Sequence, residues 1–356
     1  MTTSTGTVSS LASVQFSVLD TAMAGSGKTM HQVFEETIAL ARRAEELDFA
    51  RYWMAEHHGV PGVASSAPVI TVGALAAATA HIHVGTGGVM LPNHVPLVVA
   101  EEFGTLASLY PGRIDLGVGR GAPDPQTAQV LARSLANYGR DDFAESVAEL
   151  SSYLTGESPD GRPYRGPYVA PRADEPAAVW VLGASTVGAA GLAAKLGVPF
   201  AFAHHFGRGD AAAAFDHYRR NFRPSRAFAQ PYTIVTALTV VAPTDAEAGA
   251  IAASADLMFA QFFQAGRRFA GRLPSPEEAA AHTWSADERA FAAHRHHGQA
   301  IGGPETVKAS LTGLLARTGA DELMATMQIY RLEDRIRSLE LLAAMSGSTD
   351  LGEAPA

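Results

Sequence analysis

Polar residues that could do chemistry follow three of the apolar runs that the sequence predicts to be β-strands. They are His57 and His58 after residues 50–55, Asn93 and His94 after residues 82–91, and His204 and His205 after residues 199–203. Imidazole exchanges a proton near neutral pH, so these histidines could serve acid/base chemistry, bind a metal or satisfy loop backbone. If the strands belong to one parallel barrel, their carboxyl ends meet at one face, and we expect a site there.

A second group of residues could bind a phosphate. Gly183, Ala184, Ser185 and Thr186 stand where the run 178–183 turns into a helical pattern, so backbone N–H groups and a hydroxyl point beyond the helix start. Arg120 follows the neighbouring run and could reach the same place with a bidentate guanidinium. Each feature alone also fits an ordinary helix cap or a surface arginine.

Other patterns fit structural roles better. GSGKT at 25–29 lacks the first glycine of a phosphate-binding P-loop, because Ala22 stands at that position. His81 and His83 precede a strand and therefore face the opposite end of a barrel. A histidine metal site stays an alternative, but no carboxylates accompany the histidines at the other strand ends, and we expect no metal.

The elements that must position these residues are eight apolar runs that alternate with helical patterns. The runs span 14–19, 50–55, 82–91, 113–119, 178–183, 199–203, 232–242 and 322–330. Parallel strands need helical crossovers between them, and eight such strands can close into a barrel. The sequence therefore predicts a (β/α)₈ TIM barrel. A doubly wound sheet is the rival fold.

We expect one barrel domain over residues 14–346, with tails at 1–13 and 347–356. Insertions are predicted at about 156–176, after strand four, and at 264–300, after strand seven. Long insertions in a barrel tend to be lids or pocket walls, and we expect the second to be a mobile lid with few apolar anchors.

Composition narrows the function classes. The chain has 356 residues, 47% of them hydrophobic and 18% charged, and its net charge of -9 is spread along the sequence. We therefore expect a large core and no nucleic-acid partner. The absence of cysteine excludes disulfides and thiolate sites. Since no signal-peptide pattern and no membrane-length apolar run occur, we expect a cytoplasmic protein with no membrane partner.

Four motifs resemble the luciferase-like flavin monooxygenases, the family of (β/α)₈ oxidoreductases that contains bacterial luciferase. The motifs are RYWMAEHHGVPGVASSAP, HVGTGGVMLPNHVPLVVAEEFGTLASLYPGRIDLGVGRG, VLGASTVGAAGLAAKLGVPFAFAHHF and IGGPETVKASLTGLLARTGADELMATMQIY. They lie in order between about residues 14 and 345, so the resemblance covers nearly the whole chain.

The resemblance implies that reduced FMN binds at the carboxyl-end mouth of the barrel and, with dioxygen, oxidises a small organic substrate, as in natural-product tailoring. A separate flavin reductase would supply the reduced FMN, because GVGRG at 117–121 fails the spacing of a nicotinamide-binding motif. The resemblance also implies a homodimer.

Individual residues receive roles from the same resemblance. His57 matches the catalytic histidine, and Arg120 with the Ser185–Thr186 turn matches the phosphate contacts. Val72 and Gly73 match the position of a non-proline cis peptide under the flavin ring. The remaining expected cofactor residues are Asn93, Gly183 and Ala184, and the expected substrate pocket holds His58, His94, His204 and His205.

The chain also departs from the family pattern, because Gly188 stands where relatives often have a second serine. Three alternative functions stay open: a deazaflavin-dependent oxidoreductase on the same scaffold, a metal-dependent barrel hydrolase, and a non-catalytic flavin-binding protein.

Overall fold

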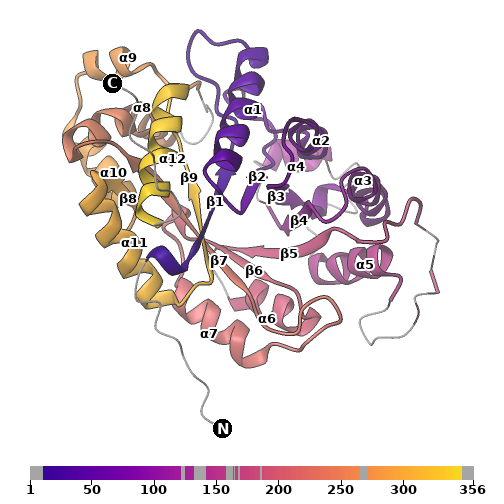
Figure 1. Cartoon of the computed structure of the whole chain (residues 1–356). Helices are drawn as coiled ribbons and strands as arrows, with labels where there is room; N and C mark the ends of the chain where they lie inside the picture. Colours follow the sequence, from indigo (N-terminus) through magenta and orange to yellow (C-terminus); the bar gives the residue numbers. More distant parts are fainter. Residues whose placement is uncertain are drawn as a thin grey trace.

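Eight parallel strands close into a barrel in the computed structural model of the chain (Figure 1), which describes residues 11–121, 125–131, 142–157, 163, 165–166, 169–184, 187–264 and 271–346. The barrel strands are β1 Gln15–Asp20, β2 Arg51–Met54, β3 His83–Met90, β4 Ile114–Gly119, β5 Ala178–Gly183, β6 Phe200–Ala203, β7 Thr233–Val241 and β9 Glu322–Thr326. Each pairs with the next, and β9 pairs with β1 to close the ring. The predicted (β/α)₈ barrel is confirmed, and each predicted run overlaps one barrel strand.

Helices surround the barrel and connect its strands (Figure 1). They are α1 Met30–Glu46, α2 Pro68–Ala78, α3 Pro96–Leu109, α4 Pro125–Leu131, α5 Phe143–Thr155, α6 Val187–Leu196, α7 Ala211–Asn221, α8 Asp245–Gln264, α9 Pro276–Ala281, α10 Ala286–His296, α11 Pro304–Thr318 and α12 Leu332–Ser346. Three 3₁₀ turns, η1 Leu11–Ser13, η2 Leu91–Asn93 and η3 His204–Phe206, precede β1 or follow β3 and β6. No helix within the described ranges is long and apolar enough to cross a membrane.

Local sequence explains where several elements begin. Helix α1 starts at a capping box, in which the Thr29 side chain accepts a hydrogen bond from the Gln32 backbone and the Gln32 side chain accepts one from the Thr29 backbone. Strand β7 is buried along all nine residues, as expected of a parallel strand covered on both faces. Its last three residues pair with a short strand that the sequence did not predict, β8 Ala300–Gly302.

The lowest layer of the barrel interior, near the end where the strands begin, is a charged network. Arg51 donates to Asp115 Oδ2 at 2.7 Å and to Glu322 Oε2 at 3.1 Å. Burial alone would raise the pKa of Asp115, but the Arg51 guanidinium and the contacts from His83 and Trp53 together outweigh it and hold the pKa below its ordinary value. Since the charges are paired and hydrogen-bonded, this network closes the lower end of the barrel.

An apolar layer lies above the charged network. The rings of Trp53 and Trp180 meet edge to face, with their centroids 5.1 Å apart. The same buried cluster contains Leu19, Ala201, Ile234 and Met324, each from a different strand, and Ala55, which follows β2. Because these two layers fill the lower barrel, space for a ligand must lie at the carboxyl ends of the strands.

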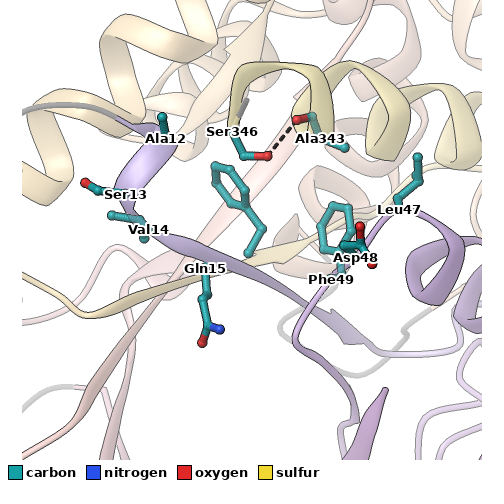
Figure 2. Close-up of a pocket in the computed structure, with 10 residues that line it drawn as sticks. Ala12, Ser13, Val14, Gln15, Leu47, Asp48, Phe49, Ala343 and Ser346 are labelled. Atoms are coloured by element: carbon teal, nitrogen blue, oxygen red, sulfur yellow. Dashed lines mark hydrogen bonds between the residues drawn. The ribbon is translucent and has the colours of Figure 1, made fainter. Parts of the chain in front are cut away.

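The N-terminal boundary lies earlier than predicted. Turn η1 is ordered and Leu11 is buried, because it packs in the main core, so the predicted tail is wrong for residues 11–13. The tails at 1–10 and 347–356 lie outside the described residues. A groove of about 260 Å³ separates η1 and the start of β1 from the turn after α1 and the end of α12 (Figure 2). It lies at the end of the barrel opposite the predicted site.

The second insertion, predicted to be poorly anchored, is held by buried contacts. Leu273 is fully buried against Met23 and Met258. Its backbone N–H donates to Ala24 O at 2.9 Å, and its carbonyl accepts from Ser26 N at 2.7 Å. Among residues 271–299 the buried apolar side chains are those of Leu273 and Ala279, so these contacts anchor one end of the insertion, and its movement as a lid stays a prediction; residues 265–270 lie outside the described ranges, as do parts of the first insertion.

Candidate active site

His57 points into the barrel mouth. It lies two residues after Ala55, which belongs to the inner apolar layer, and alternate residues of a strand share a face. Its backbone N–H donates to Ser65 O at 3.0 Å, and its Nδ1 lies 3.3 Å from Ser65 Oγ. Burial lowers the pKa of His57, so the imidazole is neutral near pH 7 and can accept a proton.

His205 lies across the mouth from His57. It follows β6, and β2 and β6 stand on opposite sides of the eight-stranded ring. The two imidazoles are close enough for a charge on His57 to disfavour a charge on His205. Nδ1 of His205 lies 2.6 Å from the Thr236 hydroxyl of β7. Burial, reinforced by His204 and His57, lowers the pKa of His205 to about 3.

Two hydroxyls, one just after β1 and one at the end of the neighbouring strand β9, complete a polar floor at the mouth. Thr21 lies two residues after Leu19, and Thr326 lies two residues after Met324, so both point inward above the apolar layer. Each hydroxyl oxygen is buried and has no hydrogen-bond partner among the described residues. Because a buried hydroxyl is costly to leave unpaired, these two groups favour a polar ligand or water above them.

Glu56 joins two of the predicted site residues into one network. Its buried carboxylate accepts hydrogen bonds at Oε1 from His58 Nε2 at 2.6 Å and from His94 Nε2 at 2.8 Å. Oε2 accepts from the Met90 backbone N–H at 3.0 Å. The hydrogen bond to Glu56 raises the pKa of His94, while that of Glu56 is lowered because the histidine contacts outweigh its burial.

The same three side chains are the one group among the described residues whose ligand atoms gather closely enough to suggest a metal. Tetrahedral zinc ligands about 2.0–2.1 Å from the ion lie roughly 3.3 Å from one another. The contacts of 2.6 and 2.8 Å are shorter and have the length of charge-assisted hydrogen bonds. The geometry therefore favours a hydrogen-bonded network of Glu56, His58 and His94 over a metal centre.

The predicted phosphate residues lie at the ends of neighbouring strands. Arg120 follows β4 directly, is exposed, and places its guanidinium 5.7 Å from the centre of the Phe143 ring. Gly183 ends β5 and Ala184 follows it, half-buried. Ser185 and Thr186 lie outside the described residues, and Gly188 is exposed near the start of α6.

Two further predicted residues have partners of their own near the mouth. His204, the residue before His205, has its Nε2 3.1 Å from the carbonyl of Gly298. Asn93 lies in η2 and donates to the Met90 sulfur at 3.6 Å. These contacts bring both residues to the carboxyl-end face, although neither belongs to the inward-pointing floor.

The predicted position of the non-proline cis peptide is wrong. Val72 and Gly73 lie within helix α2, where Val72 is fully buried, and the non-proline cis bond joins Gly87 to Gly88 in β3. A Cβ on Gly88 would lie 2.7 Å from the backbone oxygen of Gly117, so a side chain there would force the neighbouring strand β4 to shift. The glycine-rich run of β3 and its register shift after Thr86 are the local signals of such an irregular strand.

Sequence reasoning missed Glu56 and the threonine hydroxyls of the floor. Glu56 was visible as the residue before the two histidines, but its role depends on His94 from another strand. Thr326 pairs with Leu19, and Thr21 lies two residues beyond Leu19, so the two threonines come together only because β1 pairs with β9. Counting alternate residues along the last predicted run and past the end of the first would have found both threonines.

Comparisons with known proteins agree with this architecture. The family described as luciferase-like monooxygenase matches residues 14–322. A protein of Escherichia coli K12 with the same description is 39% identical over 328 residues, which cover 92% of this chain and 96% of that protein. YvbT of Bacillus subtilis is 41% identical over 92% of this chain and 95% of its own length. The crystal structure of apo-MsnO8 superposes with a TM-score of 0.81 at 34% identity, covering 95% of this chain and 99% of that one.

Proposed function

Because the chain belongs to the luciferase-like monooxygenase family, we propose that it is a monooxygenase that uses reduced FMN and dioxygen to oxidise a small organic substrate. The polar floor carries this proposal: His57 and His205 follow strands on opposite sides of the ring, and the buried hydroxyls of Thr21 and Thr326 have no partner among the described residues. A ligand with several polar ring atoms would satisfy these groups.

The residues at the rim suit the phosphate of FMN. In this proposal Arg120 holds the phosphate, assisted by backbone N–H groups beyond Ala184. Bound FMN supplies the electrons and the reaction with dioxygen, while the protein binds, orients and shields the reacting atoms. His57 is the proton-transfer group, because its imidazole is neutral and lies on the mouth floor.

Relatives support a flavin cofactor without choosing its type. A 3,6-diketocamphane monooxygenase component with the same fold was solved in complex with FMN, at 18% identity and a TM-score of 0.66. An F420-dependent secondary alcohol dehydrogenase, at 15% identity and a TM-score of 0.63, binds the deazaflavin F420. We propose FMN for this chain on the grounds of its greater similarity to monooxygenases than to the dehydrogenase.

The substrate and partners are proposed on similar grounds. One relative is an N-acetyl-S-alkylcysteine monooxygenase of Bacillus subtilis, 39% identical over 54% of this chain, and another is a 4-hydroxyprotoasukamycin monooxygenase, 34% identical over 34% of it. We propose a small substrate of this kind, in a natural-product or thioether pathway step, with a separate reductase supplying reduced FMN.

A homodimer is also part of the proposal. Ile70 at the start of α2 is 73% exposed, and Val95 and Val98 at the start of α3 are 58% and 47% exposed. These exposed apolar side chains stand on two neighbouring helices, and we propose that a second copy covers them. Sedimentation of wild-type protein and of Ile70→Glu tests it, with a shift to monomer expected in the variant.

The cofactor is tested by anaerobic titration of the protein with reduced FMN, oxidised FMN and F420. We expect reduced FMN to bind most tightly and to support oxygen consumption when substrate is added. Tighter binding of F420 would favour the deazaflavin oxidoreductase. Stoichiometric zinc in the purified protein, with no flavin binding, would favour the hydrolase and contradict the proposal.

A further inference from the structure

A cavity of about 720 Å³ lies between α8 and the second insertion, apart from the polar floor. Its walls come from the segments that follow three barrel strands: Ser26 after β1, Pro61 after β2, and α8 with the insertion after β7. Since parallel strands end at the same face, the cavity lies on the carboxyl-end side of the barrel. None of the four floor residues named above lines it. The proposed flavin site therefore leaves this cavity without a role.

One wall of the cavity is the segment 272–274, which has a cavity side and a core side. Arg272 and Pro274 line the cavity, whereas Leu273 between them is fully buried. Leu273 also forms a parallel β-bridge with Gly25 in the loop after β1. Because alternate residues of an extended segment face opposite sides, the buried Leu273 keeps its two neighbours turned toward the cavity.

The Arg272 guanidinium is held at one nitrogen and has a second edge without a partner. Nη1 donates to the backbone carbonyl of Gly25 at 3.4 Å and to that of Lys28. Nε and Nη2 have no hydrogen-bond or ion-pair partner among the described residues. These two nitrogens form an edge that matches a carboxylate with two parallel hydrogen bonds. The wall therefore presents a positioned cationic donor pair.

Two other ionisable side chains of the wall already have structural partners. Glu278 belongs to the capping box of α9, where its Oε2 accepts from the Ser275 backbone N–H at 2.6 Å, and it also accepts from the Ser26 hydroxyl at 2.6 Å. Nε2 of His282 lies 3.2 Å from Oε2 of Glu288. The rest of the wall is largely apolar and includes Pro61, Leu257, Pro274 and Ala281.

We propose that this cavity is a binding site for an organic acid, with the carboxylate on the Nε–Nη2 edge of Arg272 and an apolar body against Leu257 and Pro274. The volume suits a small molecule, since ligand pockets hold roughly 300–1,000 Å³ and are mostly apolar with a few fixed polar groups. A carboxylate accepts two charge-assisted hydrogen bonds from this edge, whereas an uncharged amide offers one acceptor oxygen. The inference goes beyond the proposed function and does not depend on a flavin.

The first test compares an acid with its uncharged amide. Calorimetric titration of the protein without added flavin uses 4-phenylbutyrate and 4-phenylbutanamide, and we expect the acid to bind roughly tenfold more tightly. Arg272→Gln should remove this preference. Arg272→Lys keeps the charge but loses the two-nitrogen edge, so it should also lose most of the preference. The matched control is Arg317→Gln, an exposed arginine of α11, which should behave as the wild type.

The second test locates the bound acid with tryptophan fluorescence. The chain has three tryptophans, and Trp53 and Trp180 are buried inside the barrel. The third, Trp284, has its ring centroid 5.5 Å from that of His282 in the cavity wall. Binding of 4-phenylbutyrate should change the fluorescence of the wild type but not that of Trp284→Phe, although both should bind the acid. Ala281→Phe narrows the cavity without removing an Arg272 contact and should weaken binding of both probes.

Several results would overturn the inference. They are a wild type that binds neither probe or binds both equally, and an Arg272→Gln variant that keeps the preference for the acid. Loss of acid binding in Arg120→Ala, with Arg272→Gln unchanged, would place the acid at the expected phosphate site instead. Retained affinity of Arg272→Gln for the amide, with thermal melting, shows that the variant is folded. Because no flavin is present, failure of the protein to bind FMN would contradict only the proposed function.

Discussion

Nε2 of His94 lies 2.8 Å from Oε1 of Glu56, and this contact ties the turn after β3 to the end of β2. The Glu56 carboxylate is buried, whereas the His94 side chain is 32% exposed. The pair therefore lies at the rim of the mouth, where two neighbouring strands end and one of its two partners reaches solvent. Its strength should depend on pH, because both partners titrate.

The Glu56 network should stabilise the fold most between about pH 4.5 and 6.5. The pKa of Glu56 is lowered from its ordinary 4.5, so its stabilisation is present above 4.5 and is lost as the pH falls through the folded value. The pKa of His94 is raised from 6.5, so its stabilisation is present below 6.5 and is lost as the pH rises through the folded value.

Glu56→Gln tests this window. The variant should lose roughly 1.5–3 kcal/mol of unfolding free energy, since a charged buried acceptor is replaced by a neutral one. Urea unfolding of both proteins from pH 4 to 8 should show the largest difference between 4.5 and 6.5. The control is His31→Asn, which breaks an exposed pair with Glu35 and should have little effect. A difference independent of pH would contradict the assignment.

Arg120→Ala should weaken the binding of reduced FMN by roughly 1.5–3 kcal/mol, because a charge-assisted contact to the phosphate is lost. Affinity for riboflavin, which has no phosphate, should not change. Arg317→Ala on α11, outside the barrel, is the matched control. An unchanged FMN dissociation constant in Arg120→Ala would remove this residue from the phosphate site.

His57→Ala should bind reduced FMN nearly as well as the wild type but turn over on the order of 10² to 10⁴ times more slowly, as for loss of a general acid or base. Since burial lowers the pKa of His57 from 6.5, wild-type activity should fall only below that pH, as the base becomes protonated. Steady-state rates across pH, with thermal melts, test both points. A variant that loses stability and activity in proportion would indicate a structural histidine.

The anchored insertion should show slow hydrogen exchange at the amides of Leu273 and Ser26 even without flavin. The Leu273 amide donates to the Ala24 carbonyl, the Ser26 amide donates to the Leu273 carbonyl, and Leu273 is fully buried. Leu273→Ala should release them and cost roughly 2–5 kcal/mol of local stability. Ala281→Gly, in the neighbouring α9, is a control for general loosening of the insertion. If both amides exchange fast until flavin binds, the insertion is a lid, as predicted from the sequence.

The sequence predicted most of the fold because barrel strands and helices carry strong periodic signals. Strand β7, buried on both faces, reads as one apolar run. Strand β8 was missed, because three residues are too few to form a pattern. The cis bond was misplaced because its position at Val72 and Gly73 came from the resemblance alone. The sequence carries no warning of this, since the helix that contains these residues is apolar on every side and shows no helical periodicity.

The site was predicted only in part, for a physical reason. His57 and Arg120 directly follow strands, so chain order alone places them at the mouth. The floor depends on which strands are neighbours and on which residues alternate inward, as with Thr21 and Thr326. Likewise, Lys28 of the GSGKT run looks available for a phosphate, but Glu36 pairs with it at 2.6 Å, which only the folded chain reveals.

The central claim is that the floor of the mouth is the flavin site, and a structure of the protein crystallised anaerobically with reduced FMN tests it most directly. We predict the flavin ring above His57, His205, Thr21 and Thr326, with the phosphate at Arg120. Another place for a ligand is the cavity of about 720 Å³ between α8 and the second insertion, which includes Leu257, Arg272 and His282. Density for FMN in that cavity, with the mouth floor bound only by water, would contradict the account.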